Sequence, residues 1–204
     1  MHGGVAVGGN VETAALAQVV PTTQGVDEQI DWSELEEIWG TRFPADYVAF
    51  METYGAGQLS GEIAILLPVP RPDAYSDGTG LRNETLNARG TWKMLGGRAG
   101  TALDVDPDSI LAWGVTSGAD IYGWLTTDDD PDRWPVLVYG RHTHPTFQIH
   151  PFGMAEFLRR LLTDKEFQEE TISVVLPEEH RFINWRQQKR WLDADLDPST
   201  GEPW

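Results

Sequence analysis

The sequence contains no cysteine among its 204 residues. Disulfides and thiolate metal sites are therefore excluded, and the composition is compatible with a reducing compartment. No run of about 18 apolar residues occurs, which excludes a membrane-spanning helix. Residues 1–24 hold no lysine or arginine, so the basic start of a secretory signal is missing and we expect a cytoplasmic protein.

Basic residues are scarce throughout: 15 lysines and arginines stand against 32 aspartates and glutamates, which gives a formal net charge of −17. Such a surface repels nucleic acids and anionic lipids, because binding them requires basic side chains that displace counterions. We therefore expect neither nucleic acid nor membrane as a partner. The same charge speeds the approach of a basic protein, although acidity also serves solubility alone.

Apolar residues are plentiful, at 40% of the chain, and include nine tryptophans, seven phenylalanines and five tyrosines. This is enough to build one substantial hydrophobic core. The sequence predicts a flexible tail over residues 1–25, a main domain over 26–165 and a C-terminal extension over 166–204. We expect the extension to hold a strand at 172–176, a basic helix at 180–192 and an acidic tail.

Helix signals open the main domain. Asp31 precedes a run with apolar residues at helical spacing and with Glu34 three positions on, an arrangement that caps a helix. Gly40 ends this helix, and Pro44 opens a second one that Gly55 stops. A strand is expected at 62–67, and residues 79–94 are compatible with a helix.

From Ile110 the pattern changes to short strands separated by turns. The expected strands cover residues 110–115, 121–126, 134–139 and 146–149. Connections this short permit only antiparallel neighbours, so we expect a meander. Gly153 then leads into the clearest amphipathic helix of the chain. The fold class predicted is α+β, with N-terminal helices, an antiparallel β-sheet meander and a C-terminal helix packed on it.

Four short sequence motifs occur in a particular order. They are Phe43-Pro44-Ala45-Asp46-Tyr47 with Tyr54-Gly55, then Trp113-Gly114 followed by Ile121-Tyr122-Gly123-Trp124-Leu125, then Trp134-Pro135-Val136, and finally the helix from Phe152 to Leu162. In this order the motifs resemble the pattern of the SMI1/KNR4-like (SUKH) superfamily, over residues 31–163. Physically they specify a scaffold, since they fix helix starts and supply aromatic core residues.

The resemblance implies a binding protein without catalytic activity or cofactor. Bacterial members are similar to immunity proteins that bind and block toxins, often nucleases, whereas fungal relatives resemble regulatory adaptors. The expected partner is accordingly a basic protein toxin, and the alternative is an intracellular regulatory or scaffold protein with the same fold. A fold hosts several functions, so this step is an analogy.

Two groups of residues imitate metal sites. His142, His144 and His150 are clustered, and a His-x-His on a strand would place both rings on one face. The stretch Asp104-Val105-Asp106-Pro107-Asp108 imitates the start of a calcium loop, but the glycine and glutamate that such a loop needs are missing. We therefore expect no metal, and no nucleophile or nucleotide-binding motif is present.

The acids are unevenly spread, with nine acids and one base over residues 27–62 and eight acids and no base over residues 104–132. A nuclease is basic around its substrate groove, so an acidic protein can occupy that groove as a phosphate mimic. The residues expected to bind the partner are those of one crowded loop and of one helix face: Asp128, Asp129, Asp130 and Asp132, with Glu34, Glu36 and Glu37. A solvated surface is the alternative interpretation of both.

Overall fold

The computed structural model describes residues 7–21, 29–68, 80–95 and 104–204. Within them a seven-stranded antiparallel sheet has the order β6-β5-β4-β3-β2-β1-β7. The strands are β1 (Gly57–Leu59), β2 (Ile63–Ile65), β3 (Ile110–Thr116), β4 (Ile121–Leu125), β5 (Val136–Tyr139), β6 (Phe147–His150) and β7 (Phe182–Asn184). The helices are α1 (Val7–Val19), α2 (Trp32–Trp39), α3 (Ala45–Thr53), α4 (Leu81–Leu95), α5 (Met154–Thr163), α6 (Lys165–Thr171) and α7 (Trp185–Asp193). The α+β fold class is thereby confirmed.

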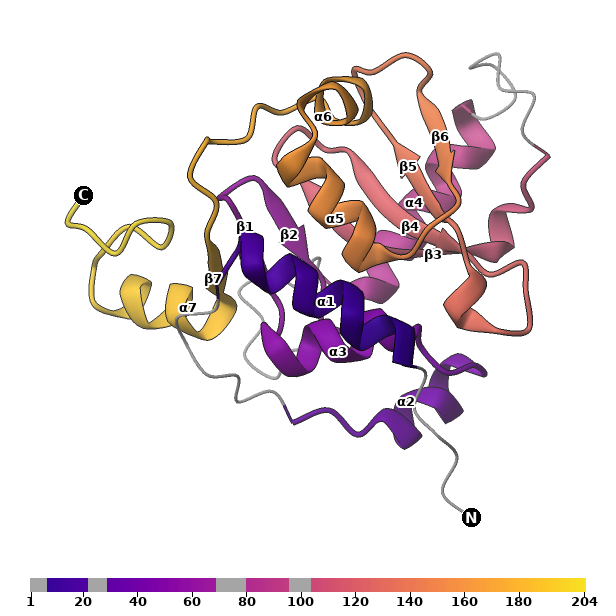
Figure 1. The fold of residues 1–204 in the computed structure, drawn as a ribbon, viewed down its shortest axis with the longest axis horizontal. Coiled ribbons are helices and arrows are strands. Elements are labelled where there is room, and N and C mark those ends of the chain that lie inside the picture. The colour runs from indigo at the N-terminus through magenta and orange to yellow at the C-terminus, as the bar shows by residue number, and fades with distance from the viewer. Residues whose placement is uncertain (1–6, 22–28, 69–79, 96–103) are drawn as a thin grey trace.

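Helices α1, α3 and α5 pack on one another and cover one face of the sheet, which is turned to the viewer in Figure 1. The core beneath them is aromatic. Trp113 and Tyr122 of the sheet contact Phe157 of α5 edge-on, and Trp124 contacts Tyr47 of α3 with ring centroids 5.1 Å apart. All five side chains are fully buried. Burial of such side chains contributes roughly 2–3 kcal/mol each, which makes this layer the main source of stability.

Helix α4 covers the opposite face of the sheet. Its Trp92 packs on Phe147 at 4.5 Å between ring centroids, and Thr85 accepts a hydrogen bond from the backbone of Ala112. A second, smaller apolar cluster lies under this helix, around Ile110 and Leu137. The helix expected near residues 79–94 is thus present, and it belongs to a separate layer.

The N-terminal segment departs from the expectation of a flexible tail over residues 1–25. Helix α1 packs between α3 and α5, and its Leu16, followed by Val20, is buried in the main core. Tyr54 donates a hydrogen bond to the carbonyl of Val20 at 2.8 Å. Leu16 and Val20 are four residues apart and so lie on one side of the chain. The small residues around them give little signal in the sequence, although they allow the helix to approach its neighbours closely.

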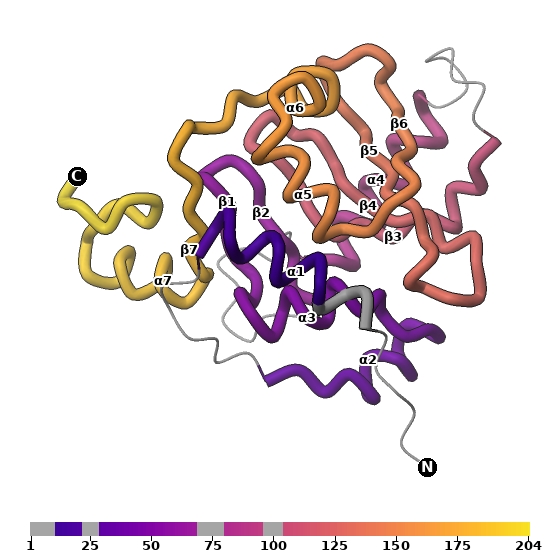
Figure 2. Tube along the Cα trace, viewed as in Figure 1, coloured from indigo at the N-terminus to yellow at the C-terminus, as the bar shows by residue number. Residues whose placement is uncertain are grey.

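The C-terminal extension also joins the sheet (Figure 2), because β7 pairs with β1 and forms one edge. The strand expected at 172–176 is wrong: this stretch is irregular, although Ile172 and Leu176 are buried. Its apolar side chains pack into the core from the irregular segment between α6 and β7. Similarly, the strand expected at 62–67 is β2 alone, and β1 precedes it in a tight hairpin.

The helix expected at 180–192 is only partly correct, because Phe182–Asn184 form β7 and α7 begins at Trp185. The remaining strands and helices are present with shifts of one or two residues at their ends. Asp31 caps α2 by accepting hydrogen bonds from the backbone of Ser33 and Glu34, and Gly40 ends the helix with φ +69°. No helix among the described residues is both long and apolar enough to cross a bilayer.

Candidate partner-binding surface

The acid-rich loop between β4 and β5 is internally ordered. Asp128 accepts a hydrogen bond from the backbone of Asp130 at 3.0 Å, and Asp130 accepts one from the backbone of Asp132 at 3.1 Å. The indole of Trp134 donates to the carbonyl of Asp128 at 2.7 Å. Aspartate favours turns because its side chain can bind the backbone two residues on, so the spacing of these acids has a local structural cause.

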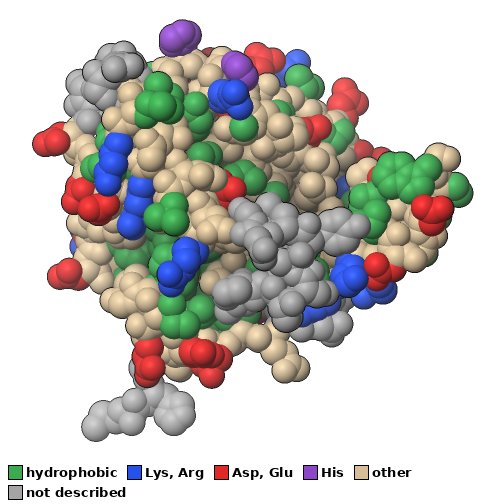
Figure 3. All heavy atoms as spheres, turned by 180° about the vertical axis from the view of Figure 1, so that it is seen from behind, with side chains coloured by type: hydrophobic (Ala, Val, Ile, Leu, Met, Phe, Trp, Pro, Cys, Tyr) green, Lys and Arg blue, Asp and Glu red, His purple; other side chains and the backbone are tan. Residues whose placement is uncertain are grey.

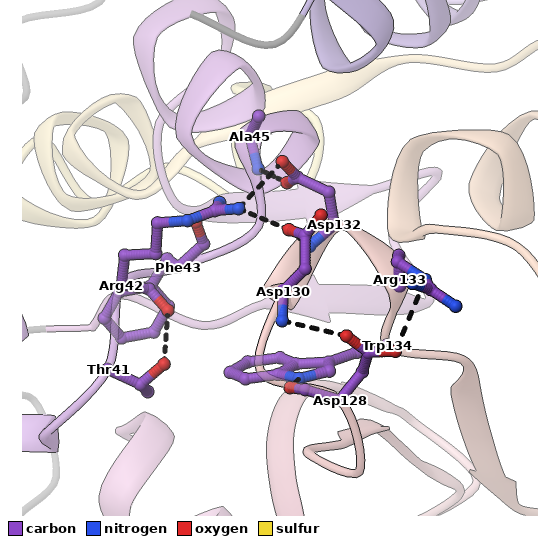
Figure 4. A network of polar contacts seen from close by, with 9 residues as sticks. All are labelled: Thr41, Arg42, Phe43, Ala45, Asp128, Asp130, Asp132, Arg133 and Trp134. Atoms are coloured by element: carbon purple, nitrogen blue, oxygen red, sulfur yellow. Dashed lines mark hydrogen bonds and ion pairs between the residues drawn. The ribbon is translucent and has the colours of Figure 1, made fainter. Parts of the chain in front are cut away.

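Arg42 ties this loop to the segment between α2 and α3 (Figure 4). Its guanidinium Nη2 lies 2.5 Å from Asp130 Oδ1 and 3.1 Å from Asp132 Oδ2. The hydrogen bond with Asp132 and the charges of both acids raise the pKa of Arg42 above its usual range, although burial opposes this shift. Arg42 therefore remains positive and neutralises part of the loop.

Asp132 has a further role at the start of α3. Its Oδ1 accepts a hydrogen bond from the backbone of Ala45 at 2.6 Å. Pro44 stands at the capping position of α3 and provides no side-chain bond, so Asp132 satisfies a helix N–H from outside the helix. The negative charge also lies favourably at the positive end of the helix.

The predicted loop residues thus divide by role. Asp128 pairs with Arg133 at 3.3 Å, and Asp130 and Asp132 pair with Arg42. Asp129 is exposed and forms no hydrogen bond or ion pair with any of the residues that the structure describes. All four acids were expected to bind the partner; three of them also form ion pairs within the protein, and Asp129 does not do so among the described residues.

The second predicted patch lies on α2. Its acids Glu34, Glu36 and Glu37 are all exposed, while Leu35 points into the core and is buried. Arg42 follows α2 directly, so the contact of Arg42 with the loop brings the acid-rich stretches 27–62 and 104–132 together. Acidic side chains also line much of the margin of the opposite face, as Figure 3 shows.

Asp46, which the sequence analysis named only as part of a motif, connects two helices. It is buried, and its Oδ2 accepts a hydrogen bond from the backbone of Ala155 at 2.9 Å, at the start of α5. Gly153 leaves room for this carboxylate, because a Cβ there would lie within 2.5 Å of Asp46 Oδ2. Burial raises the pKa of Asp46, and the bond from Ala155 opposes that shift. The acid of the Pro-Ala-Asp-Tyr motif therefore caps the start of α5.

The histidines do not form a metal site. His142 and His144 lie in the turn after β5 and not on a strand, and His150 ends β6. His150 stacks on Phe152 with ring centroids 5.5 Å apart and contacts two further phenylalanines. Burial, with a smaller contribution from Arg160, lowers the pKa of His150 to about 4.

The aspartates near residue 106 form a turn. Asp106 caps the short helix η1 (Pro107–Ser109), and Asp108 pairs with Lys93 at 3.6 Å. Among the described residues no group of three or more His, Asp or Glu side chains is arranged to hold a metal ion.

The chain was compared with models of known protein families. The family model described as SMI1-KNR4 cell-wall matches residues 29–158 of the chain. This range begins just before α2, ends within α5, and contains both Arg42 and the acid-rich loop. A search of curated proteins and a search of solved structures gave no match.

Proposed function

We propose that this chain, which belongs to the SMI1-KNR4 family, is a non-catalytic immunity protein that binds and neutralises a protein toxin in the cytoplasm. The motifs shared with the family have structural roles: Pro44 lies at the start of α3, Asp46 caps α5, and the ring of Trp124 packs in the core. A scaffold defined in this way offers surfaces for binding. Function therefore resides in the surface chemistry.

The observation that carries the proposal is the joining of two acid-rich stretches at Arg42. This contact links the segment that follows α2, whose acids are exposed, to the loop bearing Asp129. An acidic surface attracts a basic one at long range. Basic surfaces are required of proteins that act on nucleic acids, so a nuclease-type toxin fits this partner chemistry.

The second candidate function is that of an intracellular regulatory or scaffold protein. The same acidic surface and fold would serve it, with a partner that is not a toxin. The two functions differ in one consequence, since only an immunity protein protects cells from a toxic neighbour.

The deciding experiment is co-expression with the product of a neighbouring gene that encodes a large secreted protein with a short basic C-terminal domain. The proposal predicts that cells expressing this C-terminal domain survive only when the present chain is also expressed, and that the two co-purify. Survival without the chain, or death despite its soluble expression, would favour the regulatory function.

A further inference from the structure

A cleft lies on the α4 side of the sheet, at the opposite end of β4 and β5 from the acid-rich loop. It has a volume of about 500 Å³ and opens between α4 and the ends of β3, β4 and β5. That volume is within the range of ligand-binding pockets. Its walls come from Glu84 and Asn87 of α4 on one side and from the turn residue Arg141 on the other.

The floor of the cleft is apolar and is not covered by the helix. Val115, Ile121 and Tyr139 line it, and each is only partly buried. Helix α4 contacts the sheet through Thr85 and Trp92, and Ile121 and Tyr139 pack against the apolar cluster beneath it without becoming fully buried. The three floor residues therefore retain apolar surface that a ligand could bury, at roughly 25 cal/mol per Å².

The rim carries one negative and one positive group. Among the described residues, the carboxylate of Glu84 accepts one hydrogen bond, from the amide of Asn87 at 3.2 Å, and forms no ion pair. Arg141 is exposed, and within the described parts of the chain its guanidinium forms no hydrogen bond or ion pair. Both charged groups are thus available to something that enters the cleft.

The rim is also fixed in position. Asp120, which is fully buried, accepts hydrogen bonds from the hydroxyl of Thr116 at 3.0 Å and from the backbone of Arg141 at 2.8 Å. It accepts two more from the backbone and hydroxyl of Ser173 at 3.0 and 2.8 Å. Ala119 beside it has φ +64°, a strained conformation for a residue other than glycine. Such a rim is pre-organised, which lowers the entropic cost of binding.

We infer that this cleft is an anchor site for a loop of the basic partner, receiving one aromatic or long apolar side chain between α4 and the sheet. The side chain lies on Ile121 and Tyr139, a flanking lysine or arginine pairs with Glu84, and Arg141 donates to a backbone carbonyl of the loop. A single buried side chain in a rimmed pocket is the usual form of an interface hot spot. The inference rests on the proposed function in one respect, because the occupant is taken to be a segment of the basic partner.

The test uses the full chain, labelled with ¹⁵N and ¹³C, and three capped tripeptides observed by NMR. Acetyl-Lys-Trp-Lys-amide is expected to shift the signals of Ile121, Tyr139 and Arg141, and acetyl-Lys-Ala-Lys-amide and acetyl-Glu-Trp-Glu-amide to bind at least about tenfold more weakly. Free L-tryptophan, which lacks the flanking charges, is expected not to shift these signals. Equal binding of all three peptides, shifts confined to other surfaces, or binding of free tryptophan alone would overturn the inference.

Matched variants sharpen the result. Asn87→Trp fills the cleft from α4, whereas Leu86→Trp adds the same ring one residue away, at a side chain that is 62% exposed. Glu84→Lys reverses the rim charge, and Glu166→Lys makes the same change at an exposed position of α6. The first variant of each pair is expected to weaken peptide binding about tenfold, and its control to leave binding unchanged.

The peptide test contains no toxin, so its outcome is separate from that of the proposed function. Growth rescue without peptide binding would disprove the anchor site in the cleft and would still support the immunity function. Peptide binding without rescue would retain the anchor site and contradict the toxin as its partner.

Discussion

Asp129 and Asp132 lie in the same loop but differ in what they contact. Asp132→Ala removes the bond to the backbone of Ala45 and the ion pair with Arg42. Loss of a helix cap costs about 1–2 kcal/mol, and a partly exposed ion pair adds little. We therefore expect the free energy of unfolding, measured in urea, to fall by that amount. Asp129→Ala is the matched control and should change stability by less than about 0.5 kcal/mol; equal effects of both would contradict the capping role.

His150 gives the protein a specific pH dependence. Its pKa is lowered to about 4 in the folded state, from an ordinary value of 6.5, chiefly by burial. Between pH 6.5 and 4 the unfolded chain takes up a proton that the folded protein does not, so stability is lost as the pH falls through this window. With partial exposure taken into account, the loss from this group is about 2 kcal/mol.

The variant His150→Phe keeps an aromatic ring among its phenylalanine neighbours but cannot be protonated. It should lose about 2 kcal/mol less than the wild type between pH 6.5 and 4. Urea unfolding at a series of pH values measures this difference. His144→Phe, at an exposed histidine in the preceding turn, provides the control. An unchanged pH profile for His150→Phe would show that the ring is not the titrating group.

At the scale of elements, the C-terminal arm closes one edge of the sheet. Strand β7 pairs with β1, and Phe182 packs on Tyr54 with ring centroids 5.1 Å apart. Asn184 donates to the carbonyl of Tyr54 and accepts from the backbone of Arg186, which joins β7 to the start of α7. The arm is therefore part of the core even though the family match ends before it.

Deletion of residues 172–204 should expose the β1 edge and the contacts of Phe182, and the truncated protein should aggregate or melt well below the full chain. Deletion of residues 194–204 removes only the segment that folds back on α7, and its melting temperature should stay within a few degrees. The point variant Gly57→Ala would bring a Cβ against the carbonyl of Ile183 and should resemble the longer deletion in milder form. A full-length melting temperature for the longer deletion would disprove a structural role for the arm.

Sequence patterns were informative for elements with strong periodicity and weak for segments whose packing is long-range. Helix α5 and strands β3 to β6 were predicted because their apolar residues repeat at 3.6 or 2 residues. Helix α1 was expected to be loosely attached because small residues give little local signal, although α3 and α5 bury it. Of the site, the acids were predicted but not their partner: nothing local shows that Arg42 meets a loop 88 residues away.

At the scale of the whole molecule, the net charge of −17 should govern how fast a basic partner associates. Salt screens such steering, with a Debye length of about 10 Å at 0.1 M. The triple variant Glu36→Lys, Glu37→Lys and Asp129→Lys changes exposed acids that form no ion pair with other described residues. It should slow association with the toxin about tenfold or more at low salt and flatten the salt dependence, as stopped-flow mixing would measure.

The control for this experiment carries the same change of charge elsewhere. Glu166→Lys, Glu178→Lys and Glu179→Lys alter three exposed acids on and after α6. Their effect on the association rate should be clearly smaller. Equal slowing by both triple variants would mean that total charge, and not the surface formed by α2 and the loop, directs the encounter.

The central claim is that the chain neutralises a toxin by binding it directly. Its most direct test is a titration of the purified toxin domain with the purified chain while the toxin's activity on its substrate is measured. The account predicts that activity falls linearly and disappears near one equivalent of the chain, and that the mixture elutes as a single complex. Full activity in the presence of a large excess of folded chain would contradict it.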